Sequence, residues 1–280
     1  MAKLELYIPV GRQKLRCGYT TGTWAAAGAA ALLLTGETLP AVRIATPAGV
    51  AVEAELLRHA AGEGWAACAV RKDGGDDPDV TDGALIFARV ERTDTPGIVI
   101  DGGEGVGRVT LPGLDQPVGA AAINSTPRRM IGEQMEAVMA KAGYTGGLRV
   151  VISVPEGEAL ARRTFNPRLG IVGGISILGT SGIVKPMSEV ALLDSLYLEM
   201  DQRRAAGTED LLLTPGNYGE SFAREVLGLN LDRWCMCSNY LGAAIDHAAG
   251  AGFRCVLLYQ FLGERARESF TSRQTRSENS

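Results

Sequence analysis

The feature that most constrains the fold is an alternation of apolar runs and helical patterns that begins at residues 148–154, LRVVISV. A continuous apolar run of this length is typical of a strand buried on both faces. Further strands are predicted at 175–178, 211–213, 234–237 and 256–258. Helical patterns follow at 187–206, 218–227 and 240–251. Strands and helices that alternate at this spacing predict an α/β domain with a mostly parallel, doubly wound sheet.

The first half of the chain has a different pattern. Residues 20–23, three of them threonine, precede an alanine-rich run that ends near Gly36, as expected for the start and end of a helix. Short apolar stretches split by turn residues follow, at 42–45, 50–57, 65–70, 84–90 and 98–100. Many short strands and few helices predict an α+β fold here. We therefore expect an α+β domain with Gly- and Asp-rich loops over 1–145, an α/β domain over 146–262 and a disordered tail over 263–280.

Composition and charge exclude several functional classes. With 28 basic and 32 acidic residues, the net charge of −4 lacks the basic excess that nucleic-acid binding requires. No uncharged apolar run reaches the roughly 18–20 residues that a membrane span needs, and the N-terminus does not resemble a signal peptide. Five cysteines without zinc-like spacing and two distant histidines are poor material for a metal site. We expect a cytoplasmic protein without a metal of its own.

Glycines cluster in four segments, and two of these segments lie in the first half of the chain. Residues 72–83 contain five aspartates, which indicate either an exposed acidic turn or a loop that binds a hard cation. Residues 101–110 have Gly-x-Gly-x-Gly spacing but no strong helix after it, so a dinucleotide fingerprint is weak. A hairpin loop and a nest of backbone N–H groups for an anion both remain open.

The other two glycine segments lie in the second half. Residues 164–184 mix glycines and hydroxyl side chains with β-branched residues, which favours close approach of backbone or ligand, or packing of sheet against helix. Residues 211–220 form a strand-to-helix junction, where open α/β sheets bind ligands. Arginines gather at 128–129 and at 162–168, either as carboxylate-binding groups or as solvated helix faces.

Several strings together resemble one family, CbiD. They are residues 15–22 (LRCGYTTG), 72–81 (KDGGDDPDVT), 102–107 (GGEGVG), 122–124 (AIN), 127–131 (PRRMI) and the run 164–188. The similarity covers about residues 15–258. Because the strings are long and occur in order, the chain is identified as a member of this family.

The resemblance implies an activity. Members of the family use S-adenosyl-L-methionine to methylate cobalt-precorrin-5B at ring carbon C1, giving cobalt-precorrin-6A in anaerobic cobalamin (vitamin B12) biosynthesis. Cobalt is then present only within the substrate. Methyl transfer to an electron-rich carbon needs alignment and exclusion of water, so we expect no catalytic side chain. The expected partner is the cobalt-precorrin, without nucleic acid or membrane, and a homo-oligomer is left open.

This chemistry assigns roles to two sets of residues. We expect the cofactor site to be lined by Gly173, Gly174, Ser176, Gly179, Thr180, Gly216 and Asn217. The substrate carries acetate and propionate groups, which arginines bind well. The expected substrate residues are Arg128, Arg129, Arg163 and Arg168, with Asp101 and Glu104 as further contacts to the substrate or to the ribose of the donor.

The sequence departs from the family after residues 256–258. Family members continue with a Gly-His-x-Gly-Lys-like segment and further helical chain, whereas this chain has YQFLGE at 259–264 and ends at residue 280. An alternative is therefore a non-catalytic corrinoid-binding relic with an altered C-terminus. A third hypothesis takes the aspartates of 73–82 as the metal ligands of a hydrolase.

Overall fold

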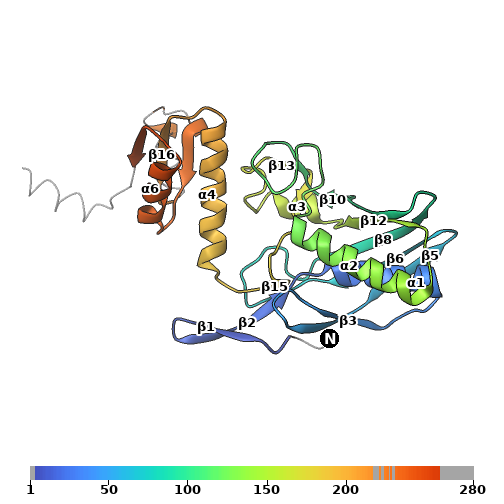
Figure 1. Cartoon of the computed structure of the whole chain (residues 1–280). Helices are drawn as coiled ribbons and strands as arrows, with labels where there is room; N and C mark the ends of the chain where they lie inside the picture. Colours follow the sequence, from blue (N-terminus) through green and yellow to red (C-terminus); the bar gives the residue numbers. More distant parts are fainter. Residues whose placement is uncertain (1–3, 217–220, 222–223, 227, 229–230, 259–280) are drawn as a thin grey trace, which may run out of the picture. The chain divides into compact units, whose positions relative to one another are not determined.

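The computed structural model describes residues 4–216, 221, 224–226, 228 and 231–258, and it divides into two compact units. The first unit is Met1–Ser188 and the second is Glu189–Ser280 (Figure 1). Each unit contains helices and strands, so the predicted mixture of α and β structure is confirmed.

A five-stranded mixed sheet forms the centre of the first unit. Its strands, in spatial order, are β5 (Leu57–Gly62), β6 (Trp65–Arg71), β8 (Leu85–Thr93), β12 (Gly147–Ser153) and β9 (Gly97–Gly102). Neighbours are antiparallel except β12 and β9, which are parallel with Leu148 opposite Ile98. The sheet therefore combines strands from both halves of the chain.

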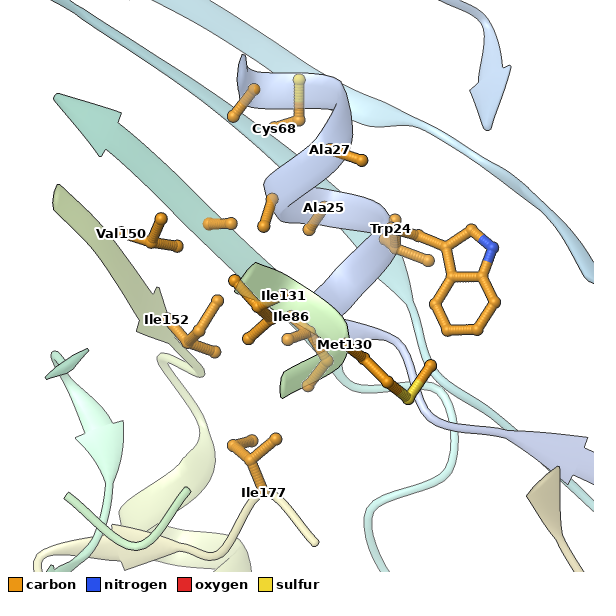
Figure 2. Close-up of a cluster of buried hydrophobic side chains, with 14 of the residues drawn as sticks. Trp24, Ala25, Ala27, Cys68, Ile86, Met130, Ile131, Val150, Ile152 and Ile177 are labelled. Carbon is orange, nitrogen blue, oxygen red and sulfur yellow. The ribbon is translucent and has the colours of Figure 1, made fainter. Parts of the chain in front are cut away.

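Two helices pack beside this sheet and close the core. They are α1 (Gly22–Thr35) and α2 (Ser125–Ala142). Figure 2 shows Trp24 and Ala25 of α1 near Ile131 of α2 and Ile152 of β12. Because α1 contacts β6, β8 and α2, its residues from Gly22 to Ala31 are all buried, and alanine and glycine allow this close approach. Figure 1 shows α1 and α2 on the same side of the sheet.

Short paired segments complete the first unit. β1 (Tyr7–Val10), β2 (Gln13–Tyr19), β7 (Asp73–Gly75) and β15 (Ile183–Val184) form one small sheet, and β3 (Ala41–Ala45) pairs with β4 (Ala51–Glu55). β10 (Gly105–Val106) is parallel to β14 (Gly174–Ile175), and β11 (Arg108–Val109) is antiparallel to β13 (Ile171–Val172). The short helix α3 (Gly157–Ala161) packs against β10 and β14.

The second unit contains a three-stranded parallel sheet in the order β17 (Trp234–Met236), β16 (Asp210–Thr214), β18 (Cys255–Leu258). The helices α4 (Glu189–Ala205) and α6 (Leu241–Gly250) pack on its Leu211 and Leu213 face, and the short 3₁₀ helix η1 (Leu231–Arg233) precedes β17. The opposite face carries Leu212 and Trp234. A doubly wound sheet has helices on both faces, so this arrangement requires a helix on the Leu212 and Trp234 face. The helix predicted at 218–227 lies mostly outside the described residues.

The structure corrects the predicted domain boundary near residue 145. β12 pairs with β8 and β9, and β14 pairs with β10, so residues 147–188 belong to the first unit. The apolar run of β12 indicates that the strand is buried, but it does not indicate which strands pair with it. The sequence prediction therefore placed this run in the parallel sheet of the α/β domain. The predicted tail over 263–280 lies outside the described residues. No helix in the described part is long and apolar enough to cross a membrane.

Candidate functional site

Two glycine-rich segments that are distant in sequence lie side by side in the first unit. The pairing of β10 with β14 and of β11 with β13 brings residues 105–109 against residues 171–175. Asp101 and Glu104 lie on the first segment, while Arg168, Gly173, Gly174 and Ser176 lie on or beside the second. The fold thus places part of both predicted residue sets along one strip, which we call the glycine strip (residues 101–109 and 168–176).

At the centre of the strip, three glycines allow backbone segments to touch. A methyl group added at Gly105 would overlap the Val154 carbonyl oxygen, and one added at Gly157 or Gly174 would overlap the Gly105 carbonyl oxygen. Gly105 also has φ +68°, a conformation that favours glycine. Packing of backbone segments therefore accounts for glycine at position 174. For the segment 164–184, packing was the alternative to contact with a ligand.

Asn166 holds the second segment in place, and the sequence analysis did not single it out. Its side chain is 8% exposed, its Nδ2 donates to the Gly174 carbonyl at 3.3 Å and its Oδ1 accepts from the Ser176 hydroxyl at 2.9 Å. Ser176, a predicted cofactor residue, is therefore oriented by Asn166. The only signal in the sequence is that Asn166 falls within the segment 164–184.

The remaining predicted cofactor residues lie in open loops or in the second unit. Gly173 is exposed with φ +83° and has open space where a side chain would be. Thr180 is exposed, and a Cβ at Gly179 would lie 3.0 Å from the Thr20 methyl group, so this loop borders the start of α1. Gly216 belongs to the second unit, and its carbonyl accepts from the Thr214 hydroxyl at 3.2 Å. Asn217 lies outside the described residues.

Arg128 has a structural role that differs from the predicted one. Its guanidinium donates to three backbone carbonyls, those of Ile100 at 2.7 Å, Ile123 at 2.8 Å and Ala121 at 3.3 Å. Burial lowers the pKa of Arg128 below its usual value, although Asp101 and Asp115 oppose the shift. These bonds tie α2 to β9 and the segment beside it, so the guanidinium is already engaged by the backbone. The contact of Arg128 with a substrate carboxylate stays a prediction.

The other predicted arginines are more accessible. Arg129 is exposed and pairs with Glu133 at 3.4 Å, one turn further along α2. Arg163 is exposed, and Arg168 is half-buried with its guanidinium 6.0 Å from the centre of the Phe165 ring. Exposed pairs of this kind contribute little to stability, so Arg129 can exchange Glu133 for another carboxylate.

Asp101 and Glu104 differ in their availability. Asp101 forms a two-bond ion pair with Arg108, at 2.7 and 3.2 Å, and also accepts from the Gly102 amide. The bond from Arg108 lowers the pKa of Asp101 below its ordinary value. Glu104 is exposed, and its backbone carbonyl accepts from the Val154 amide at 2.8 Å. Glu104 therefore has the freer carboxylate.

The acidic loop 72–83 is held together by its own ion pairs. Asp73 receives two bonds from Arg16, at 2.6 and 2.8 Å, and Asp79 pairs with Lys72. Asp82 accepts a hydrogen bond from a backbone amide at 2.8 Å. Within the described ranges, no cluster of three side chains has the arrangement of a metal site. The metal-dependent hydrolase hypothesis loses its support, because these carboxylates already neutralise basic groups or bind amides.

A separate groove of about 630 Å³ lies between β9 and α2. Its lining is mostly apolar, including Ile98, Ile100, Met139 and Tyr144, and it carries the carboxylate of Glu136. None of the predicted site residues lines it. A carboxylate in an apolar wall does not favour a ligand rich in carboxylates, so the glycine strip is the better candidate site for such a ligand.

Exposed glycine loops with basic side chains beside them are the kind of surface that suits an anionic ligand. The CbiD family model matches residues 8–186. Cobalt-precorrin-5B C(1)-methyltransferase of Ruminiclostridium cellulolyticum is 47% identical over 264 residues, covering 93% of this chain and 68% of that protein. The protein of the same name from Thermoanaerobacter sp. is 46% identical, covering 93% of this chain and 71% of that protein.

A solved structure agrees with these relatives. The crystal structure of the cobalamin biosynthesis protein CbiD from Archaeoglobus fulgidus is 32% identical, with a TM-score of 0.50, covering 92% of this chain and 81% of that one. The chain belongs to the CbiD family, as its sequence motifs predicted.

Proposed function

We propose that this protein transfers a methyl group from S-adenosyl-L-methionine to C1 of cobalt-precorrin-5B, giving cobalt-precorrin-6A in anaerobic cobalamin biosynthesis. The observation that carries this proposal is the 47% identity, over 93% of the chain, to a protein with that methyltransferase name. Identity at this level across both units does not favour the hypothesis of a corrinoid-binding relic.

The reaction makes limited demands on the side chains. The electron pair of C1 forms a bond to the methyl carbon as the bond from that carbon to sulfur breaks, and S-adenosylhomocysteine leaves. Alignment of the two reactants and exclusion of water are the main requirements, and alignment can contribute up to about 7–11 kcal/mol in favourable cases. Glycine loops that let both reactants approach the backbone, together with carboxylate-binding arginines, meet these requirements without a nucleophile.

We assign the donor to the loops around Gly173, Ser176, Gly179 and Thr180 of the first unit, while Gly216 and Asn217 stay predictions from the sequence. The open space at Gly173 and the positive φ at Gly179 (+131°) support close approach of a flat ligand to the backbone. We assign substrate carboxylates to Arg129, Arg163 and Arg168, with Glu104 as a further polar contact. Asp101 and Arg128 act as positioning residues through Arg108 and the backbone.

The test is an anaerobic incubation of the full chain with cobalt-precorrin-5B and methyl-labelled S-adenosylmethionine, followed by mass spectrometry. One labelled methyl group added to the substrate is the expected result. Tight binding of cobalt-precorrin-5B without methylation would instead favour the relic hypothesis.

Neighbouring arginines provide a matched pair of variants for the substrate assignment. Arg163→Met removes a predicted contact, whereas Arg162→Met removes an exposed arginine that pairs with Glu158 at 3.2 Å. We expect a raised KM for cobalt-precorrin-5B only with Arg163→Met. Equal KM values for the two variants would remove Arg163 from the site.

A further inference from the structure

The five-stranded sheet of the first unit has one face that α1 and α2 do not cover. Both helices lie on the same side of the sheet (Figure 1), where they pack on side chains such as Ile86 and Ile152. Successive residues of a strand point to opposite faces, so Phe87 and Val151 point away from these helices. Both are partly exposed, and neither belongs to the core that contains α1 and α2. We call this side the open face; it carries Trp65, Ala67, Phe87, Arg89, Glu91, Val99, Asp101, Arg149, Val151 and Ser153.

Apolar side chains cross the open face from one strand to the next. Trp65, Phe87 and Val151 are partly buried, and Val99 on the edge strand β9 is 59% exposed. A sheet face that meets only water usually carries polar side chains at such alternate positions. From the usual spacing of strands and residues, the face measures about 14 Å across four strands and about 13 Å along them. A flat and partly apolar surface of this extent indicates a site that a broad ligand covers.

The open face also carries positive charge. Glu91 accepts a hydrogen bond from Arg89 at 2.6 Å and lies 3.5 Å from Arg149, so one carboxylate serves two guanidinium groups. Arg89 lies over the Trp65 ring, 4.0 Å from its centre, which keeps its guanidinium close to the sheet. The two arginine side chains are 44% and 48% exposed, and each guanidinium has five N–H donors. They can therefore bind further carboxylates from solution.

The open face adjoins the glycine strip at the edge that β9 forms. Arg108 pairs with Asp101 of the open face at 2.7 Å, and it lies opposite Val172 where β11 pairs with β13. Gly173, which we assign to the methyl donor, follows Val172 directly. Arg108 and Asp101 add one charge of each sign, so the excess of positive charge on the face remains. A ligand on the open face would thus have the donor loop at one edge.

We propose that the open face binds the macrocycle of the substrate, with its rings on the apolar side chains and its acetate or propionate groups on Arg89 and Arg149. This inference rests on the proposed function, and it adds a surface for the rings to the arginines assigned there. A broad, flat ligand that carries several carboxylates fits both the apolar side chains and the excess of guanidinium groups. Ligand carboxylates would share these groups with Glu91.

A second copy of this chain is the alternative occupant of the open face. In a two-fold dimer the same surface of both copies meets, so Arg89 and Arg149 would face a second positively charged surface. Like charges brought together at an interface oppose association. The charge of the face therefore favours an anionic ligand over a second copy.

Two partners of one ion pair provide the sharpest test. Arg149→Met keeps an apolar stem and removes the guanidinium, so affinity for cobalt-precorrin-5B should fall about tenfold, as for loss of a hydrogen bond to a charged group. Glu91→Gln releases both arginines from their carboxylate and should raise the affinity about two- to fivefold. If the pair were only structural, removal of either partner would not strengthen binding.

Arg92→Met is the matched control. Arg92 also lies on β8 but on the helix side of the sheet, where it donates to the Leu33 carbonyl at 3.2 Å. Anaerobic calorimetry should give an unchanged affinity for cobalt-precorrin-5B with this variant, and an unchanged affinity for S-adenosylmethionine with all three variants. Melting temperatures should stay close to that of the wild type, because exposed ion pairs contribute little to stability.

The outcomes separate this site from the proposed reaction. If the wild type binds and methylates cobalt-precorrin-5B, but Arg149→Met and Glu91→Gln bind it with the wild-type affinity, the open face is not the substrate site and the reaction stands. If the wild type does not bind cobalt-precorrin-5B, both proposals are wrong. If Arg149→Met changes the sedimentation of the protein but not its affinity, a second copy covers the face and the proposed site is wrong.

Discussion

Alanine at position 174 should destabilise the first unit through a clash between backbone segments. The added methyl group would overlap the Gly105 carbonyl oxygen and lie 2.7 Å from the Val106 amide nitrogen. Both atoms belong to the backbone, so no side-chain rotation relieves the clash. Overpacking typically costs about 1–3 kcal/mol, and a backbone clash belongs at the upper end of that range. For a unit of this size, about 3 kcal/mol corresponds to a melting temperature lower by roughly 6–12 °C.

Thermal and urea unfolding followed by circular dichroism measure this effect, with Gly132→Ala as the matched control. Gly132 lies inside α2 with open space around its missing side chain, so alanine there should raise stability by about 0.5–1 kcal/mol. A Gly174→Ala variant as stable as the control would refute the packing argument. If such a stable variant also failed to bind S-adenosylmethionine, position 174 would return to the donor site.

Three further predictions follow from the contacts of charged groups. Arg128→Met removes three hydrogen bonds to backbone carbonyls and should lower the unfolding free energy by about 2–4 kcal/mol. Arg129→Met, the control, should change it by less than about 0.5 kcal/mol. Equal effects of the two variants in urea unfolding would contradict a structural role that is specific to Arg128. Asp101→Asn should cost less than about 1 kcal/mol at pH 7, because the side chains of Arg108 and Asp101 are 44% and 35% exposed. Arg108 lowers the pKa of Asp101, so the stability difference between the wild type and Asp101→Asn is present at pH values above 3.8, the ordinary pKa of the carboxyl group, and disappears as the pH falls through the lowered pKa. Urea midpoints of both proteins from pH 7 to pH 3 measure this difference. A difference that grows on acidification would contradict the prediction. A chelator should leave the melting temperature unchanged, because Arg16 and Lys72 already bind the carboxylates of the acidic loop; a fall reversed by added divalent cation would disprove this.

Local patterns in the sequence predicted individual elements well. The helix that follows Thr20 and Thr21 ends at Gly36, which adopts φ +72°. The apolar run at 148–154 is a strand with Leu148 and Ile152 fully buried. Its neighbours in the sheet could not be predicted, because pairing with β9 and β8 depends on segments about fifty residues away and leaves no trace in the run itself. The domain boundary was misplaced for that reason.

The local geometry of the candidate site was harder to predict. Glycine in a buried segment indicates close approach, but the residue alone does not say whether a ligand or another strand approaches, and at Gly174 it is a strand. Likewise, two adjacent arginines look equivalent in the sequence, yet Arg128 is used by backbone carbonyls and Arg129 faces solvent. The function was predicted from the family motifs. Several motifs that occur in the same order identify a family, whereas no single residue does.

The pairing of β15 with β2 has a consequence for synthesis of the protein. Ile183 lies opposite Tyr19, so β2, near the start of the first unit, is paired with the last strand of that unit. A ribosome must therefore deliver nearly the whole unit before this sheet can close, and such distant pairings form slowly. Until then, the edge of β2 that will receive β15 is open to other chains and vulnerable to aggregation. Expression at reduced temperature or with a chaperone should therefore increase the yield of folded protein.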